Sequence, residues 1–354
     1  MIRDEKQKEA LEIIENNNNL TIAASVGFGK TNLTLKYLES KNYKTLIVCS
    51  IPIQKTWLKE LNDKYSHLTS TIEFTTFRSL IKKDLNYDCL VIDECHNLLE
   101  THLVYLENFK NKIIGLTGTP PKQENSIKYR ILKKYLPIKF EYYLDEAITD
   151  KVLNDYQIYI HKLELNDKKN FKIKTKKGFF FTSEIDNYNY WSNKIINSNS
   201  RLEEEKNRIF RMRMIMSYDS KVFYCKKLIE EIKNKCLIFC SNINQAEYLC
   251  NNSYTSKNKK SQINLDNFIN NKITKLSCVN QLSEGVNIPN LKNIIILHSF
   301  GNEFRLIQKL GRAVRLNPKE ISNIHILCYK NTIDEKWVAK AISHLNTQNI
   351  KTIE

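Results

Sequence analysis

The sequence predicts an α/β protein made of two similar units, each a parallel sheet with helices on both faces. Three observations lead to this prediction. Short apolar runs alternate with stretches of helical periodicity over the first 120 residues, and the same alternation returns from about residue 233. The chain has 354 residues, enough for two domains that each bury a core. A more charged middle segment, from about 125 to 234, separates the two alternating parts.

Five runs in the first part have the length and composition of buried strands. They are rich in Val, Ile and Thr and lack polar alternation, which is typical of strands covered on both faces. Stretches 31–40 and 52–65 lie between them and have apolar residues at helical spacing. The predicted strands are 19–25, 44–50, 70–76, 88–94 and 112–118.

The rest of the chain predicts a second unit after an irregular connection. The middle segment indicates a helix at 127–136, a strand at 155–165 and charged helices through 201–232. Four further buried strands follow, and a helix ends the chain. We place the domains at 1–143 and 144–354, with a basic and aromatic insertion near 166–200 in the second. The four strands are 235–241, 273–279, 293–299 and 323–329.

The net charge favours a polyanionic partner. Lys and Arg number 55 against 39 Asp and Glu, which gives a formal charge of +16. Such a field attracts nucleic acid. The alternative is that an A·T-rich genome enriches lysine without any binding role, so charge alone does not decide.

Cysteine usage and hydropathy indicate the compartment. The nine cysteines include no C-x-x-C pair, so we expect small buried thiols in a reducing environment, without disulfides or a zinc site. No apolar run approaches the roughly 18 residues that span a bilayer. We therefore expect a cytoplasmic protein without a membrane partner.

The stretch 25–31, "SVGFGKT", is the first chemical motif, and we name it the phosphate loop. It follows a predicted strand and opens a predicted helix, where backbone amides and the helix dipole favour a phosphate. Lys30 would neutralise the β- and γ-phosphates, and Thr31 would bind Mg²⁺. The alternative is an ordinary glycine-rich turn, since Ala24 replaces the first glycine of the Walker A pattern. The predicted nucleotide contacts are Ser25, Val26, Gly27, Phe28, Gly29, Lys30 and Thr31.

An acidic pair ends the strand 88–94. Asp93 would hold Mg²⁺, and Glu94 would orient and deprotonate the attacking water. Ligands of open α/β sheets bind at this end of the strands. The alternative is a solvated pair of acids capping a strand.

The order D-E-C-H at 93–96 resembles the second motif of superfamily 2 helicases, in its D-E-x-H form. Further motifs of that family follow in sequence. The stretch 116–122 resembles the third motif, which implies that Thr117 and Thr119, with His96, couple the acids to nucleotide state. The stretch 3–14 resembles the segment before the phosphate loop and makes Gln7 the expected adenine-edge contact.

The second unit carries the other half of the resemblance. The stretch 281–290 resembles the fifth motif, with Gly285 at the nucleotide and Asn287 in place of the usual Asp. "QKLGRAVR" at 308–315 matches Q-x-x-G-R-x-x-R. Its helical spacing puts Gln308, Arg312 and Arg315 on one face, where the resemblance implies arginine fingers on the phosphates. In isolation this octamer would instead be a solvated basic helix face.

The resemblance also implies contacts to nucleic acid. They fall on Ser50 and Thr76 in the first unit and on Ser241 and Asn280 in the second. For the Ser and Thr residues the alternative is a helix N-cap.

The stretch 171–183, "FKIKTKKGFFFTS", allows two interpretations. One is a protruding hairpin whose lysines contact phosphate and whose aromatic rings stack on bases. The other, which we favour from the sequence, is an edge-strand pair that places Phe179, Phe180 and Phe181 partly in the core of the second unit.

The resemblance implies two tandem RecA-like domains that bind ATP and Mg²⁺ in a cleft and move on nucleic acid. The D-E-C-H box and the "LTGTP" and "EGVNIP" forms are similar to the DNA-directed phage and restriction branch of the superfamily. We therefore expect DNA in preference to RNA, with a protein partner as one source of specificity. Three alternatives stay open: a translocase that remodels complexes without unwinding, an RNA helicase, and a non-catalytic nucleotide-gated binding module.

Overall fold

The computed structural model describes residues 2–25, 27–175, 178–279, 282, 288–299, 306, 309, 320–343 and 345–354. The described chain forms two compact units. The first contains residues up to Asp155, and the second begins at Tyr156 and includes most of the described chain after it. The domain limits at 143 and 144 stay a prediction.

A six-stranded sheet forms the centre of the first unit, in the order β3-β2-β4-β5-β1-β6. Its strand pairs run parallel. All five predicted strands are present. Side chains of β1, β2, β4 and β5 are buried on both faces of the sheet, whereas the edge strand β3 is partly exposed. The sixth, β6, was not predicted, and it pairs with β1. The strands are β1 Asn19–Ala24, β2 Thr45–Val48, β3 Ile72–Thr75, β4 Cys89–Asp93, β5 Lys112–Thr117 and β6 Ile138–Tyr142.

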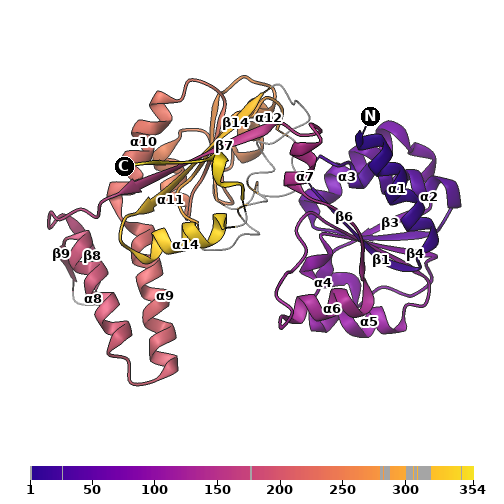
Figure 1. Cartoon of the computed structure of the whole chain (residues 1–354), viewed down its shortest axis with the longest axis horizontal. Helices are drawn as coiled ribbons and strands as arrows, with labels where there is room; N and C mark the ends of the chain where they lie inside the picture. Colours follow the sequence, from indigo (N-terminus) through magenta and orange to yellow (C-terminus); the bar gives the residue numbers. More distant parts are fainter. Residues whose placement is uncertain are drawn as a thin grey trace. The chain divides into compact units, whose positions relative to one another are not determined.

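Helices cover both faces of this sheet. In Figure 1, α1 to α3 lie on one side of the strands and α4 to α6 on the other. The sequence of α3 explains its packing on the sheet. Its buried residues Ile53, Trp57 and Leu61 recur every four positions and so form one apolar stripe along the helix. The helices are α1 Ile2–Asn16, α2 Lys30–Lys41, α3 Ile51–Lys64, α4 Phe77–Leu80, α5 Leu103–Asn108, α6 Ile127–Tyr135 and α7 Leu144–Thr149, with 3₁₀ turns η1 Ser66–Leu68, η2 Cys95–Asn97 and η3 Glu100–His102.

The second unit is built on a seven-stranded sheet in the order β11-β12-β10-β13-β14-β7-β15. Strand pairs run parallel from β11 to β14 and between β7 and β15. The strands are β7 Asp155–Leu163, β10 Cys236–Phe239, β11 Ser253–Tyr254, β12 Lys275–Cys278, β13 Asn293–Ile296, β14 Ile321–Tyr329 and β15 Ile350–Ile353. The helices are α8 Glu184–Ile196, α9 Arg201–Ser217, α10 Asp219–Glu231, α11 Ile243–Leu249, α12 Ser261–Ile269 and α14 Ile333–Ile342, with the 3₁₀ turn η4 Thr347–Asn349. Two α/β units of this kind confirm the predicted fold class.

The predicted insertion near 166–200 contains a hairpin and the helix α8, and α9 follows it. Strands β8 Phe171–Thr175 and β9 Gly178–Thr182 pair only with each other among the described strands. The helices α8 and α9 run side by side beyond the hairpin (Figure 1), where Trp191 stacks on Phe210 with ring centroids 4.9 Å apart. The favoured interpretation of an edge-strand pair is wrong, because Phe179, Phe180 and Phe181 are 58%, 51% and 53% exposed.

Two predictions about composition can be compared with the structure. All nine cysteines are buried free thiols, which confirms the prediction that they act as small buried side chains. Within the described ranges, no helix has both the length and the apolar character that a membrane crossing requires.

Candidate nucleotide site in the first unit

The candidate site lies at one edge of the first sheet. Strands β4, β5 and β1 are neighbours in space and run parallel, so their carboxyl ends meet at the same edge. The loop after β1 is the phosphate loop, the acidic pair spans the end of β4 and the start of the next loop, and the predicted coupling threonines span the end of β5 and the loop after it. Three segments separated by up to about 90 residues are thereby brought together, at the edge where open α/β sheets bind ligands.

Two glycines shape the phosphate loop. Gly27 and Gly29 have φ values of 87° and 92°, in the region that glycine adopts most readily. A Cβ atom on Gly29 would lie 2.8 Å from Gln7 Nε2 and 2.9 Å from Arg3 Nη2. The helix α2 begins directly after Gly29, at Lys30. The loop therefore favours glycine for its backbone angles, and a side chain at residue 29 would also displace the ends of the Gln7 and Arg3 side chains.

Side chains from α1 hold the loop from outside. Gln7 Nε2 donates to the Phe28 carbonyl oxygen at 2.5 Å, and Arg3 Nε donates to the same oxygen at 3.3 Å. Gln7 was predicted as an adenine contact, and the structure shows that it also anchors the loop. The adenine contact stays a prediction.

The Phe28 side chain packs into the unit. Its ring is 1% exposed and lies 5.4 Å from the Phe140 ring and 5.5 Å from the Tyr142 ring, between centroids. Both partners belong to β6, the strand that the sequence did not reveal. The Phe28 side chain is therefore part of the core of the unit, where β6 supports the phosphate loop, and the Phe28 amide donates to the Ser25 carbonyl oxygen at 3.3 Å.

Lys30 lies between the phosphate loop and the loop after β5. Its Nζ donates to the carbonyl oxygens of Ala24 at 2.6 Å and Ser25 at 3.3 Å. A Cβ atom placed on Gly118 would be 3.7 Å from the same Nζ, so the two loops approach each other at this ammonium group. Thr31 follows as the second residue of α2 and is half-buried.

Asp93 is a buried carboxylate with two defined donors. Trp57 Nε1 donates to Oδ2 at 2.8 Å, and the backbone amide of Glu94 donates to Oδ1 at 2.9 Å. Burial and the neighbouring Glu94 charge raise the pKa of Asp93 to about 6, while Trp57 and the Lys30 charge oppose this rise. Trp57 was missed by sequence reasoning, although its place in a buried helical stripe after a strand was visible.

The backbone turns sharply at the second acid. Glu94 has a φ of 54°, in the left-handed region that non-glycine residues rarely adopt. Strained residues of this kind cluster at functional sites. The turn directs the chain into η2, which carries His96 back toward β5.

A short polar chain joins the acidic pair to β5. Glu94 Oε2 lies 3.2 Å from His96 Nδ1, and the same nitrogen lies 2.9 Å from Thr117 Oγ1. Thr117 Oγ1 also accepts from the Thr119 backbone amide at 3.1 Å. The four predicted residues are therefore connected in space, and their coupling role stays a prediction.

The donors at this edge fit a nucleotide phosphate with a hard divalent cation. Each carboxylate oxygen of Asp93 accepts one hydrogen bond and keeps further lone pairs for a ligand. Mg²⁺ prefers oxygen and takes only one or two protein carboxylates beside phosphates and water. Asp93 and the Thr31 hydroxyl would supply the protein ligands, and the amides of the phosphate loop would face the phosphates.

The predicted nucleic-acid contacts lie at helix starts. Ser50 and Thr76 occupy the N-cap positions of α3 and α4, yet neither side chain makes a capping hydrogen bond. Thr76 Oγ1 donates to Ser79 Oγ at 3.3 Å. Ser241 donates its backbone amide to Gln245 Oε1 at 3.2 Å, and its buried hydroxyl has no partner among the described residues. Their contacts to nucleic acid stay predictions.

Several predicted site residues lie outside the described part of the chain. They include one amide of the phosphate loop and all of the predicted contribution of the second unit to the nucleotide. The arginine fingers therefore stay a prediction. These residues are Val26, Asn280, Gly285, Gln308, Arg312 and Arg315.

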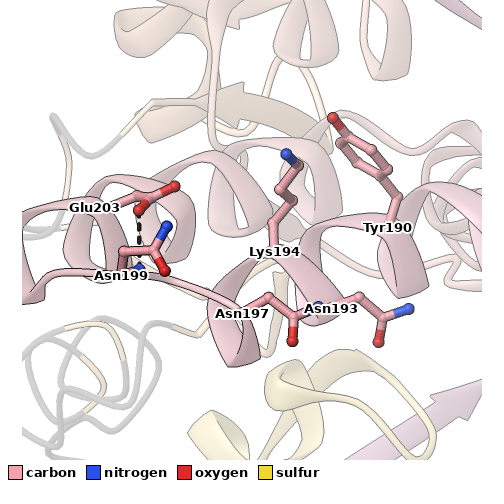
Figure 2. A pocket seen from close by; sticks show the side chains of 6 residues that line it. All are labelled: Tyr190, Asn193, Lys194, Asn197, Asn199 and Glu203. Carbon is pink, nitrogen blue, oxygen red and sulfur yellow. Dashed lines mark hydrogen bonds between the residues drawn. The ribbon is translucent and has the colours of Figure 1, made fainter.

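A separate hollow of about 340 Å³ lies between α8 and α9 in the second unit (Figure 2). Its lining is polar, and the Asn199 amide donates to Glu203 Oε2 at 3.0 Å across the start of α9. This bond caps the start of α9. The lining side chains are Tyr190, Asn193, Lys194, Asn197, Asn199 and Glu203.

Comparison with known families and sequences finds similarity to proteins that are named as helicases, translocases and nucleoside triphosphatases. Residues 220–317 match the helicase conserved C-terminal domain. The DNA 3'-5' translocase XPB2 of Sulfurisphaera tokodaii is 21% identical, over 93% of this chain and 82% of its own length. Nucleoside triphosphatase I of Choristoneura fumiferana entomopoxvirus is 32% identical, over 80% of this chain, which spans about half (47%) of that relative.

A similar solved structure is the helicase Lhr of Mycobacterium smegmatis bound to ssDNA and AMP-PNP. It has a TM-score of 0.61 and 15% sequence identity, and the alignment covers 99% of this chain and 48% of Lhr. At this identity the likeness concerns the fold, which is that of tandem RecA-like helicases. The sequence matches therefore show similarity to helicases, translocases and nucleoside triphosphatases, with the helicase conserved C-terminal domain matched over residues 220–317.

Proposed function

We propose that the chain is an ATP-driven motor that moves along or unwinds nucleic acid, with DNA as its preferred substrate. The observation that carries the proposal is the meeting of three loops at the carboxyl edge of β1, β5 and β4. These segments hold a phosphate-type turn, an acidic pair whose first member, Asp93, is buried, and a polar connection between that pair and β5. The helicase C-terminal domain and the similarity to a DNA translocase support a motor over a kinase or a switch.

The residues of the first unit have separate tasks in this proposal. The phosphate loop binds the phosphates through its amides, and Lys30 neutralises the terminal ones. Asp93 is held in place by Trp57 and by the Glu94 amide. Glu94 orients and deprotonates the attacking water. When bound, Mg²⁺ supplies charge neutralisation on the phosphate oxygens.

The Glu94, His96 and Thr117 chain would report the state of the nucleotide. Its members pass from the acidic pair to β5 through contacts of 3.2 Å and 2.9 Å. A shift of Glu94 on hydrolysis would therefore move the loop after β5. We assign the coupling role to His96, Thr117 and Thr119, and the arginine-finger role to Arg312 and Arg315, assisted by Gln308.

The D-E-C-H sequence at 93–96 and the branch it resembles favour DNA over RNA. ATPase activity measured in parallel with single-stranded DNA, duplex DNA, branched DNA and RNA tests this preference. Greater stimulation by RNA than by every DNA would contradict it.

The decisive variant for catalysis is Glu94→Gln. It keeps the size of the side chain but removes the general base, so we expect loss of nucleic-acid-stimulated phosphate release while nucleotide binding is retained. The exposed Glu100, in the next turn, offers Glu100→Gln as a matched control. Turnover by Glu94→Gln equal to that of Glu100→Gln would refute Glu94 as the general base. A wild type without nucleic-acid-stimulated ATP turnover would refute an enzymatic role and leave a nucleotide-gated binding module.

Two motor activities can be separated by one further pair of assays. Fork and duplex unwinding reports a helicase, whereas displacement of a triplex-forming strand reports translocation alone. ATP turnover with triplex displacement and no unwinding would indicate a translocase that remodels complexes.

A further inference from the structure

The hairpin β8-β9 has two chemically different faces. In its antiparallel register, Lys172 pairs with Phe181 and Lys174 with Phe179. Cross-strand partners point to the same side, and alternate residues of a strand share a side. One side of the hairpin is therefore made of Lys172, Lys174, Phe179 and Phe181, which we name the Lys/Phe face.

The opposite face anchors the hairpin to the second unit. Phe171 is 8% exposed and packs in a cluster with Ile215, Tyr218 and Tyr329, and Ile173 packs against the same cluster. The Phe171 and Tyr218 rings meet edge to face, with centroids 5.1 Å apart. Because one face is tied to this cluster, the hairpin holds its other face in a fixed direction.

The Lys/Phe face is exposed and internally ordered. Phe179 and Phe181 are 58% and 53% exposed, and their rings meet edge to face at 5.7 Å. Lys172 Nζ lies 3.9 Å from the centroid of the Phe179 ring, a cation–π geometry. Gly178, with a φ of 137°, begins β9 in a conformation that favours glycine.

The charge of the segment identifies the ligand class. Residues 171–182 contain four lysines and neither Asp nor Glu. Proteins that bind single-stranded nucleic acid combine positive groups, which neutralise the phosphates, with aromatic rings, which stack on unpaired bases. The alternation of lysine and phenylalanine on this hairpin provides both kinds of group. A protein partner fits less well, because lysine is depleted from the buried centres of protein interfaces.

We propose that the Lys/Phe face is a binding platform for single-stranded nucleic acid, on which Phe179 and Phe181 stack with bases while Lys172 and Lys174 contact phosphates. The proposal rests on the proposed function only in taking nucleic acid as the substrate. Among the residues that the sequence resemblance assigned to nucleic acid, none lies in this hairpin.

The test compares binding of two fluorescent probes by the full chain: a short oligothymidylate and a strand of equal length with abasic sites. We expect the wild type to prefer the strand with bases and Phe179→Ala/Phe181→Ala to lose about tenfold or more of that preference. Phe180→Ala is the matched control, because Phe180 pairs with Ile173 on the anchored face and is 51% exposed. Phe179→Leu/Phe181→Leu keeps apolar area without aromatic faces and should lose the preference as well.

The lysines are tested by salt dependence. Each phosphate contact to a single strand contributes roughly 0.7 to the slope of the logarithm of the binding constant against the logarithm of the salt concentration. Lys172→Gln/Lys174→Gln removes two such contacts, so we expect a slope shallower by about 1.4 units with the preference for bases retained. Lys168→Gln/Lys169→Gln, on exposed residues before β8, is the control.

Retained base preference in both Phe179/Phe181 double variants, or equal loss in Phe180→Ala, would overturn the platform. A wild type that binds both probes equally would overturn it too and would point to a protein as the ligand of the aromatic rings. These binding assays need no ATP hydrolysis. A failure of ATPase stimulation, which would refute the proposed function, is therefore distinguishable from a failure of the platform.

Discussion

Trp57→Phe is the perturbation that tests most directly how the structure prepares Asp93. Trp57 is fully buried in α3, and its Nε1 donates to Asp93 Oδ2 at 2.8 Å. Phenylalanine keeps an aromatic ring in the stripe beside Ile53 and Leu61 but removes the donor. Asp93 then keeps the Glu94 amide at Oδ1 and loses its side-chain partner.

The expected magnitude follows from the charge of the acceptor. A hydrogen bond to an ionised group contributes about 1.5–3 kcal/mol, and about 1.4 kcal/mol corresponds to a factor of ten. The donor also lowers the pKa of Asp93, so its loss raises that pKa further above the ordinary value. Both effects disfavour the ionised carboxylate that would bind Mg²⁺. We therefore expect the Mg²⁺ concentration for half-maximal ATPase activity to rise by about tenfold or more.

The assay is a Mg²⁺ titration of nucleic-acid-stimulated ATPase activity, with thermal unfolding measured in parallel. Trp337→Phe is the matched control, because Trp337 lies in α14 of the second unit and is half-buried. It makes the same chemical change away from the acidic pair. A Trp57→Phe protein with lowered thermal stability but an unchanged Mg²⁺ requirement would refute the reasoning, since Trp57 would then be only a packing residue.

Two further predictions concern stability. Gly115→Ala places a Cβ 2.7 Å from Thr21 Oγ1, so thermal unfolding should show a loss of about 1–3 kcal/mol; an unchanged melting temperature would contradict this. Burial lowers the pKa of His161 and His325 from 6.5 to about 4. Their contribution to stability is therefore complete above pH 6.5 and is lost as the pH falls toward 4, by about 2 kcal/mol per histidine at pH 5. Denaturant unfolding at several pH values measures this, and a His161→Gln/His325→Gln variant as pH-sensitive as the wild type would exclude the pair as the cause.

The buried strands could be predicted because burial on both faces requires a recognisable sequence pattern, a continuous apolar run. The runs that form β4 and β10 are short and apolar at nearly every position, and this pattern predicts a strand covered on both faces. Two of the edge strands, β6 and β15, lack this pattern. In β6 buried and exposed residues alternate, and β15 is mostly exposed. Their pairing with β1 and β7 depends on neighbours that only the folded chain supplies.

The candidate site could be predicted in its residue types but only partly in its contacts. The spacing of glycines, lysine and acids marks the phosphate loop and the acidic pair, because the chemistry needs those groups at strand ends. The Trp57 contact to Asp93 joins residues 36 positions apart, and no local pattern encodes it. The hairpin was misjudged because "FFF" is as apolar as a core strand, and only the register shows that two of its rings lie away from the anchored side.

The buried thiols have a practical consequence for mapping how the two units move. Burial raises the pKa of Cys49, Cys89 and Cys236 to about 12, and the thiolate is the reactive form. All nine natural cysteines are buried. Maleimide dyes should therefore react selectively with cysteines introduced on the surface, one in each unit, without removal of the natural thiols. Energy transfer between such dyes would follow the distance between the units through the ATP cycle in an otherwise unaltered chain.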